Sequence, residues 1–286
     1  MLTPIAIDTR GNGANKEHIE NGFEEDGKDT PYFDVTLPLK EQWMYQAVGD
    51  VILSHSLLLS FPEVDNKRTA LTGISWGGIL TSVATSLDHR FRVAVPVYGC
   101  GFLAESGRMK QQLDKLPSLE RETWIKQYDP SGYLSRAKCP VLFLNGTNDV
   151  HFYLPSMAQS ATLVSKGQVL IKYKLRHGHG HGWNNQEIGT FIDHYLCNGP
   201  ALPKIKSFRL RDNMLSVKAV SSSSVQKVVL YYTTDTNVEQ EKCEWYFAEA
   251  VPSGKEWKVE LPQKVVRWFV NVTDSSGNQL SGGLQE

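Results

Sequence analysis

The stretch RTALTGISWGGILTSVATSLD (68–88) joins a short strand pattern, a turn and a helix pattern. Residues 68–73 are typical of a strand and residues 77–88 of a helix. Ser75 lies between them, with a glycine two residues to either side, on a turn that would project its hydroxyl beyond the sheet as a nucleophile. We expect side chains at positions 73 and 77 to collide with neighbouring backbone, and the Trp76 N–H to face a developing oxyanion. The alternative is a chance turn, because glycine and serine are common in loops.

Strand and helix patterns alternate on both sides of this turn. Apolar residues recur at helical spacing over residues 39–60, and Pro62 ends that helix. The other expected elements are strands at 91–99, 139–149 and 168–175, and helices within 104–128, 156–167 and 187–196. Such alternation predicts an α/β fold, in which a parallel sheet is covered by helices on both faces.

The pattern changes near residues 198–200, which read Asn-Gly-Pro. From residue 203 onward only short β-type runs occur, and apolar and charged residues alternate within EWKVEL (256–261), as in a half-buried strand. We therefore expect an α/β domain over residues 1–200 and a small antiparallel β-sandwich over residues 203–286.

The sandwich also suggests a rival from another functional class. If it docked carbohydrate or protein beside an inert hydrolase half, exposed aromatic side chains such as Trp245, Tyr246 and Trp268 would be consistent with that role. The alternation of apolar and polar residues makes Trp268 more typical of core.

A carboxylate and three histidines follow the two later strands. Asp149 stands at the end of strand 139–149, and His177, His179 and His181 come directly after strand 168–175, separated by single glycines. The order Ser, Asp, His is that of a nucleophile, its orienting acid and its base. The alternative for Asp149 is a capping role in its loop.

The alternative for the histidines is a metal site, because three histidines on an extended segment can bind zinc or nickel. The intervening glycines give that segment no rigidity, and no nearby carboxylate or cysteine completes a ligand shell. We favour catalysis, with His177 as the base because it lies nearest the strand end. His179 is the alternative base, and His181 is expected to be a loop or pocket residue.

Composition and charge exclude several other classes of protein. The 286 residues are 41% hydrophobic and 21% charged, with a net charge of −1, as in ordinary globular proteins. No basic tract is present that would neutralise nucleic-acid phosphates, and no apolar run approaches the ~20 residues of a membrane span. The four cysteines are widely spaced without a CxxC pair, and we expect free buried thiols. The expected partner is a small neutral molecule, with no nucleic acid, membrane span, metal or cofactor.

These segments resemble the α/β-hydrolase superfamily, and within it the acetylxylan-esterase-like and dipeptidyl-peptidase-like bacterial serine hydrolases. The resemblance is carried by IAIDTRGNG (5–13), FPEVDNKRTALTGISWGG (61–78), FRVAVPVYGCGFL (91–103), YDPSGYLSRAKCPVLFLNGTND (128–149) and HGHGHGWNNQEI (177–188). It implies that Ser75 is the nucleophile, Asp149 the acid and His177 or His179 the base.

The resemblance also implies a reaction: two-step hydrolysis of a carboxylic ester, of acetyl or another small acyl group on carbohydrate, without a cofactor. A peptidase of the dipeptidyl or acylaminoacyl type would use the same triad. Such a peptidase usually has an N-terminal gating domain. No such domain is recognised in the given sequence, and we therefore favour the esterase.

The front of the chain departs from the superfamily pattern. Members normally have earlier strands before the D-x-R-G segment, and a loop, often HGG-like, that donates the second oxyanion N–H. Here that segment already occupies residues 8–11, and residues 5–7 are expected to form a short buried strand. We hypothesise that Met1 is an internal methionine of a longer gene product, the alternative being a minimal member of the superfamily.

The residues around the expected pocket leave two interpretations open. Residues 99–135, with Phe102, Leu103, Trp124 and Tyr133, either form a cap over the pocket or pack against the sheet as ordinary helices. Trp76 and Trp183 are candidates for an aromatic wall against a sugar or acyl group, although an aromatic residue beside a nucleophile is equally typical of core.

Overall fold

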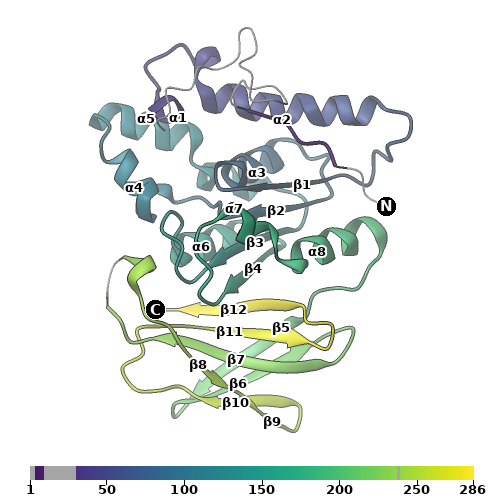
Figure 1. Cartoon of the computed structure of the whole chain (residues 1–286), viewed down its shortest axis with the longest axis vertical. Coiled ribbons are helices and arrows are strands. Elements are labelled where there is room, and N and C mark those ends of the chain that lie inside the picture. The colour runs from purple at the N-terminus through teal and green to yellow at the C-terminus, as the bar shows by residue number, and fades with distance from the viewer. Residues whose placement is uncertain (1–3, 10–29, 237–238) are drawn as a thin grey trace.

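The computed structural model describes residues 4–9, 30–236 and 239–286. Its first half alternates strands and helices, and its second half is formed by strands alone apart from one short 3₁₀ turn (Figure 1). The helices are α1 (Thr30–Phe33), α2 (Trp43–Ser60), α3 (Trp76–Leu87), α4 (Gly107–Leu113), α5 (Ser118–Tyr128), α6 (Leu154–Leu163), α7 (His179–Trp183) and α8 (Gln186–Cys197). The first four strands are β1 (Ala70–Ile74), β2 (Val93–Val97), β3 (Val141–Gly146) and β4 (Gly167–Lys172). The expected strands and helices between residues 39 and 197 are confirmed, and α7 is an addition to them.

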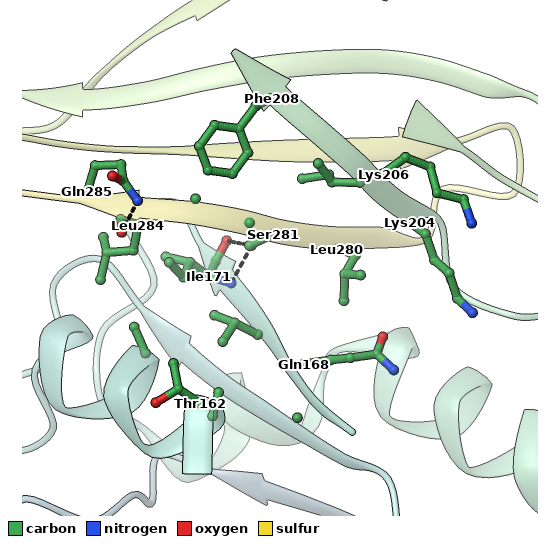
Figure 2. A pocket seen from close by; sticks show the side chains of 17 residues that line it. Thr162, Gln168, Ile171, Lys204, Lys206, Phe208, Leu280, Ser281, Leu284 and Gln285 are labelled. Atoms are coloured by element: carbon green, nitrogen blue, oxygen red, sulfur yellow. Dashed lines mark hydrogen bonds between the residues drawn. The ribbon is translucent and has the colours of Figure 1, made fainter. Parts of the chain in front are cut away.

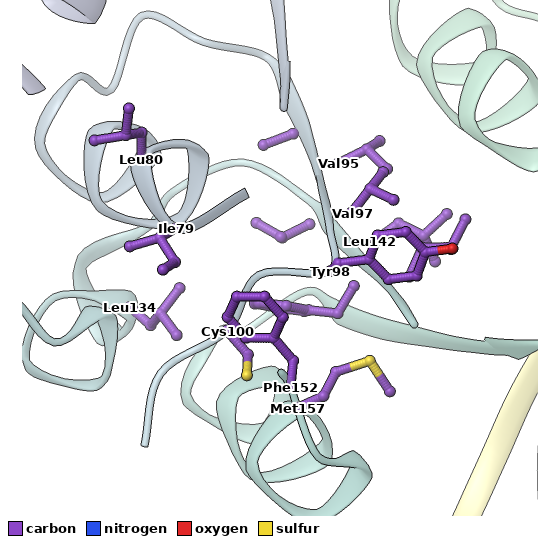
Figure 3. Packing of buried hydrophobic residues seen from close by; sticks show 14 of the residues in the cluster. Ile79, Leu80, Val95, Val97, Tyr98, Cys100, Leu134, Leu142, Phe152 and Met157 are labelled. Atoms are coloured by element: carbon purple, nitrogen blue, oxygen red, sulfur yellow. The ribbon is translucent and has the colours of Figure 1, made fainter. Parts of the chain in front are cut away.

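Strands β1 to β4 pair in parallel and in sequence order. All residues of β2 and β3 are buried, and because successive side chains point to opposite faces, both faces of these strands must be covered. Helix α3 packs on β1 and β2, α6 on β3 and β4, and α8 on β2. Figure 3 shows this core, where Ile79 of α3, Leu142 of β3 and Met157 of α6 are buried. The predicted α/β fold is confirmed.

The second half consists of β5 (Lys204–Arg211), β6 (Met214–Val220), β7 (Val225–Thr233), β8 (Tyr246–Glu249), β9 (Val251–Ser253), β10 (Glu256–Glu260), β11 (Arg267–Asp274) and β12 (Gln279–Gln285). These strands form two antiparallel layers, ordered β12-β11-β7-β8 and β5-β6-β10-β9. Their facing side chains make a separate core, which includes Val217 of β6, Leu230 of β7 and Val270 of β11. The predicted antiparallel sandwich is confirmed.

The sandwich is joined to the parallel sheet by strand pairing. Ser281 of β12 pairs antiparallel with Val169 of β4. Within the described residues, this pairing makes one eight-stranded sheet with the strand order β1-β2-β3-β4-β12-β11-β7-β8 (Figure 1). The Ser281 hydroxyl accepts the N–H of Ile171 at 2.7 Å, and the Asn271 amide donates to the carbonyl of Ile171 at 2.9 Å. Hydrogen bonds therefore cross the boundary expected near residue 200.

The predictions for residues 5–7 and for Trp245 were wrong. Residues 5–7 are not a strand: no ladder joins them to β1, and Ile5 and Ile7 are 47% and 39% exposed. An apolar run becomes a strand only when a neighbour pairs with its backbone. The second error is Trp245, which is buried in the core rather than exposed. Trp268 is buried as its alternation predicts, and Tyr246 is exposed.

No disulfide joins the four cysteines. Cys100, Cys139 and Cys243 are buried as predicted, whereas Cys197 is exposed, contrary to the prediction. In the part of the chain that the structure describes, no helix combines the length and apolarity of a membrane span.

A buried polar network ties α2 to the end of α3. His55 bonds Asp88 through Nδ1 at 2.7 Å and Thr69 through Nε2 at 2.9 Å. Arg90 donates to both oxygens of the same carboxylate. Burial alone would raise the pKa of Asp88, but the hydrogen bonds from Arg90 and His55 outweigh it and lower the pKa to about 2. This network is a stability element remote from the site described next.

Candidate active site

Ser75 occupies the turn between β1 and α3, as predicted. Its backbone has φ 59° and ψ −119°, a region that a residue with a side chain rarely adopts. Strain of this kind costs about 1–3 kcal/mol and persists only where surrounding contacts fix it. Here the Ser75 N–H donates to the carbonyl of Val97 at 2.9 Å, and the Ser75 carbonyl accepts the N–H of Gly78 at 2.8 Å.

The glycines around Ser75 differ from the expectation at one position. A Cβ on Gly73 would lie 2.3 Å from the carbonyl oxygen of Gly77, so glycine is required there. A Cβ on Gly77 itself would meet nothing within 4 Å, which contradicts the collision expected at this position. The second constrained glycine is Gly78, whose Cβ would lie 2.6 Å from the carbonyl oxygen of Val97. Helix α3 approaches the end of β2 at Gly78, one residue beyond the predicted position.

Ser75, His177 and Asp149 come together at the carboxyl ends of the parallel strands. The Ser75 hydroxyl is 3.0 Å from His177 Nε2, and His177 Nδ1 is 2.9 Å from Asp149 Oδ2. Because an ionised carboxylate only accepts hydrogen bonds, Nδ1 carries the proton and Nε2 is left to accept the Ser75 O–H. This is the protonation state that a general base needs.

Asp149 is fully buried, and its surroundings hold the carboxylate in one orientation. Its Oδ1 accepts the backbone N–H groups of His151 at 2.6 Å and Phe152 at 2.8 Å, while Oδ2 faces His177. Both oxygens therefore have partners, as a buried charge requires.

The three histidines of the HGHGHG segment have different positions. His177 lies in the irregular segment after β4 and reaches Ser75, whereas His179 begins α7 with its ring centroid 6.3 Å from that of His177. His181 is exposed in α7. Both ring nitrogens of His177 are hydrogen-bonded, Nδ1 to Asp149 and Nε2 to Ser75. Within the described residues, no three histidine, cysteine or acidic side chains are grouped as metal ligands.

Trp76 begins α3, so its N–H lies in the first turn, where backbone donors have no acceptor within the helix. Its indole packs with Tyr32, Phe33 and Trp43, at centroid distances of 4.8, 5.3 and 5.5 Å. Trp76 is thus part of an aromatic cluster as well as a neighbour of the hydroxyl. Trp183 is 46% exposed.

A small cavity of about 160 Å³ opens beside Ser75. It is lined by Ser75, Trp76, Arg108, Met109, Gln112, His151 and Phe152. One wall is α4, which belongs to the segment expected to be either a cap or ordinary packing. Core packing is confirmed for Leu103 and Trp124, which are fully buried, while a cap formed by this segment stays a prediction.

His151 was not predicted from the sequence, although it lies only two residues after Asp149. Its ring centroid is 4.4 Å from that of His177, and its side chain borders the small cavity. Burial, followed by the neighbouring His177, lowers the pKa of His151 to about 4, so the ring is neutral at neutral pH.

Tyr98 was also not predicted as a site residue, and it packs against the His177 ring. Its ring centroid lies 4.8 Å from that of His177, and its hydroxyl donates to the carbonyl of Arg176 at 3.1 Å. Tyr98 has φ 50°, a positive value that no sequence pattern predicts for a tyrosine. Its effect is to fix the backbone immediately before His177.

The sequence pattern of the prolyl oligopeptidase family matches residues 36–194, more than half of the chain. The chain belongs to the prolyl oligopeptidase family. The matched range contains Ser75, Asp149 and His177, and the fold is that of the α/β-hydrolase superfamily, to which this serine-hydrolase family belongs.

Solved structures with a similar fold include two bacterial esterases. An acetyl xylan esterase from Paenibacillus sp. R4 is 22% identical, with a TM-score of 0.52 over 66% of this chain and 64% of its own. Acetyl xylan esterase 1 from Thermoanaerobacterium sp. JW/SL YS485 is 19% identical, with a TM-score of 0.50 over 66% of this chain and 65% of its own. An acylaminoacyl peptidase from Pyrococcus horikoshii is 19% identical, with a TM-score of 0.44 over 54% of this chain and 28% of its own. This chain thus spans less than two thirds of each of them, and none of the curated proteins matches it.

A larger cavity in this prolyl oligopeptidase family member, of about 690 Å³, lies between α6 and β4 on one side and β5 and β12 on the other (Figure 2). It lies at the pairing of β12 with β4, and the paired residues Ser281 and Val169 both line it. Lys204 and Lys206 lie along its rim, and neither Ser75 nor His177 borders it. Ser75 therefore opens to the smaller cavity.

Proposed function

We propose that this member of the family is a serine esterase that removes acetyl or other small acyl groups, with acylated carbohydrate as the substrate class. The observation that carries the proposal is the hydrogen-bonded series Ser75–His177–Asp149 beside a cavity of about 160 Å³. The carbohydrate part of the proposal is supported by the acetyl xylan esterases of similar fold.

The proposed reaction has two steps. Ser75 Oγ attacks the acyl carbonyl carbon while His177 Nε2 takes the hydroxyl proton, and His177 then gives that proton to the departing alcohol as the ester C–O bond breaks. Water next attacks the acyl-enzyme with His177 as base, and the acid leaves as Ser75 recovers its proton. Asp149 orients the imidazole and stabilises its charged form, and the Trp76 N–H is the proposed donor to the oxyanion.

The size of the cavity favours a short acyl group. Pockets for drug-sized ligands begin at about 300 Å³, roughly twice the volume beside Ser75. Trp76, Met109 and Phe152 give it apolar wall, while Arg108 and Gln112 stand at α4. A short acyl chain fits this space, and each added methylene would have to displace packed side chains.

A peptidase of the dipeptidyl or acylaminoacyl type is the second candidate, because the family match favours it. Both candidates use the same three side chains and differ in the bond that is cleaved. The proposed partner in either case is a small molecule rather than nucleic acid.

The first experiment is intact mass measurement after treatment with a fluorophosphonate, on the full chain and on Ser75→Ala. We expect one adduct on the wild type and none on the variant. Initial rates are then compared for p-nitrophenyl acetate, p-nitrophenyl octanoate and aminoacyl p-nitroanilides. Fast acetate cleavage with slow octanoate cleavage supports the small-acyl esterase; a preference for the anilides would select the peptidase, and an unlabelled folded wild type would refute both.

A further inference from the structure

Residues 239–245, called the brace below, lie just before β8 and reach the α/β half (Figure 1). They contact residues 146–154, which run from the last residue of β3 to the first residue of α6 and are called the acid turn because they carry Asp149. Gln240 of the brace is fully buried. A buried amide at this position demands hydrogen-bond partners, and the acid turn supplies all of those described for its side chain.

The Gln240 side chain is bonded to both ends of the acid turn. Its Oε1 accepts the N–H of Leu154 at 2.6 Å. Its Nε2 faces three carbonyl oxygens, those of Asp149 and Phe152 at 3.2 Å and that of Gly146 at 3.4 Å. The Gln240 side chain thus supplies hydrogen-bond partners for backbone groups that the acid turn leaves unpaired within itself.

Two further bonds hold the brace in place. Asn148 of the acid turn donates from Nδ2 to the carbonyl of Cys243 at 2.9 Å, and the Tyr173 hydroxyl donates to the carbonyl of Trp245 at 3.0 Å. Cys243 and Trp245 are themselves buried in the main core. The bond from Tyr173 and the core packing of Cys243 and Trp245 therefore anchor the brace from outside the acid turn, and the brace can act on that turn as a fixed support.

We propose that Gln240 is a positioning residue, which holds the acid turn so that the Asp149 carboxylate meets His177 in a single geometry. This inference rests on the proposed function. Its physical basis is that the carboxylate is fixed by N–H groups of the same turn, His151 and Phe152. Losing Gln240 removes a hydrogen bond from the Leu154 N–H and from the buried carbonyls that Gln240 faces, so the turn relaxes toward other arrangements.

The test uses the full chain with Gln240→Ala and Gln240→Met, the second of which keeps the side-chain volume without the hydrogen bonds. Asn271→Ala is the matched control, because Asn271 is also a buried amide of the second half that donates to a carbonyl of the first half, that of Ile171. It does not contact the acid turn in the described contacts. All variants are compared well below their unfolding temperatures.

Two readouts are needed. The first is the rate of fluorophosphonate labelling and the kcat and KM for p-nitrophenyl acetate, where we expect the Gln240 variants to lose about 10- to 100-fold in kcat with KM little changed. The second is the proton NMR signal of the His177 Nδ1–H, assigned by its absence in His177→Ala, which we expect to shift or broaden in the Gln240 variants. Asn271→Ala is expected to lower the melting temperature but to leave both readouts unchanged.

Wild-type values of kcat and of the Nδ1–H signal in both Gln240 variants would overturn the proposal, and so would an equal loss in Asn271→Ala. If Gln240→Ala fails to fold, Gln240→Met decides. If the wild type shows the Nδ1–H signal but takes up no fluorophosphonate, the proposed function fails, while the NMR comparison still decides the role of Gln240.

Discussion

The tightest constraint at the Ser75 turn is steric, and it yields a graded prediction for three glycines. Gly73→Ala would place a Cβ 2.3 Å from the Gly77 carbonyl oxygen, against a limit of about 3.0 Å for real contacts, so the two backbones must separate by about 0.7 Å. Gly78→Ala would place a Cβ 2.6 Å from the Val97 carbonyl oxygen, which requires a smaller movement of about 0.4 Å.

These displacements act on Ser75 directly, because its N–H bonds the same Val97 carbonyl and its own carbonyl bonds Gly78. A misplacement of about 1 Å costs about 10²-fold in rate. We therefore expect Gly73→Ala to slow fluorophosphonate labelling by about 30- to 100-fold and Gly78→Ala by about 10-fold. Each should also destabilise the fold by about 1–3 kcal/mol through overpacking.

Gly77→Ala is the matched control, because its Cβ meets nothing within 4 Å. An open site changes stability by no more than about 0.5 kcal/mol, so labelling should stay within about twofold of the wild type. Labelling rates are measured by intact mass, and stability by urea unfolding at the same temperature. A large loss in Gly77→Ala, or none in Gly73→Ala, would refute the steric argument.

Three other outcomes follow from the charges around the site and the core. Asp149→Asn should lower kcat by about 10⁴-fold while the chain stays folded, because an amide favours the wrong tautomer of His177; kcat and circular dichroism measure this. His151→Gln should leave the midpoint of the pH–rate profile above pH 5 unchanged, because a ring with a pKa of about 4 carries no charge there. Asp88→Asn should cost about 2 kcal/mol at pH 7 in urea unfolding, since the pKa of Asp88 is depressed from 3.8 to about 2. A carboxyl with a depressed pKa stabilises the fold above its ordinary pKa and ceases to do so as the pH falls to about 2, so the difference between variant and wild type should shrink in acid.

Local sequence was sufficient for features built from neighbouring residues. The strand, turn and helix around Ser75 lie within 21 residues, and Asp149 follows its strand directly. The sequence favoured His177 over His179 as the base but could not exclude His179, because the choice depends on where α7 begins. The structure begins that helix at His179, which leaves His177 in the irregular segment that reaches Ser75.

Features that depend on distant contacts were missed or misassigned. Gly78 is constrained by the carbonyl of Val97, a residue in the next strand, so the motif alone pointed to Gly77 instead. Ile5 and Ile7 have the composition of a strand without a paired neighbour. Gln240 carries no motif, and only the fold brings it to a turn some ninety residues earlier in the chain.

Within the described residues, the second half of the chain bonds the turn of the proposed acid rather than the turn of the proposed nucleophile. Gln240 bonds the turn that carries Asp149. Ser75 follows β1, which lies at the other end of the parallel part of the sheet. A change in the brace should therefore disturb the orientation of the His177 imidazole before it disturbs the turn at Ser75. Because the proposed catalysis needs a carboxylate and an imidazole held to within a fraction of an ångström, a segment that does not line the small cavity would contribute to it through the rigidity of the acid turn.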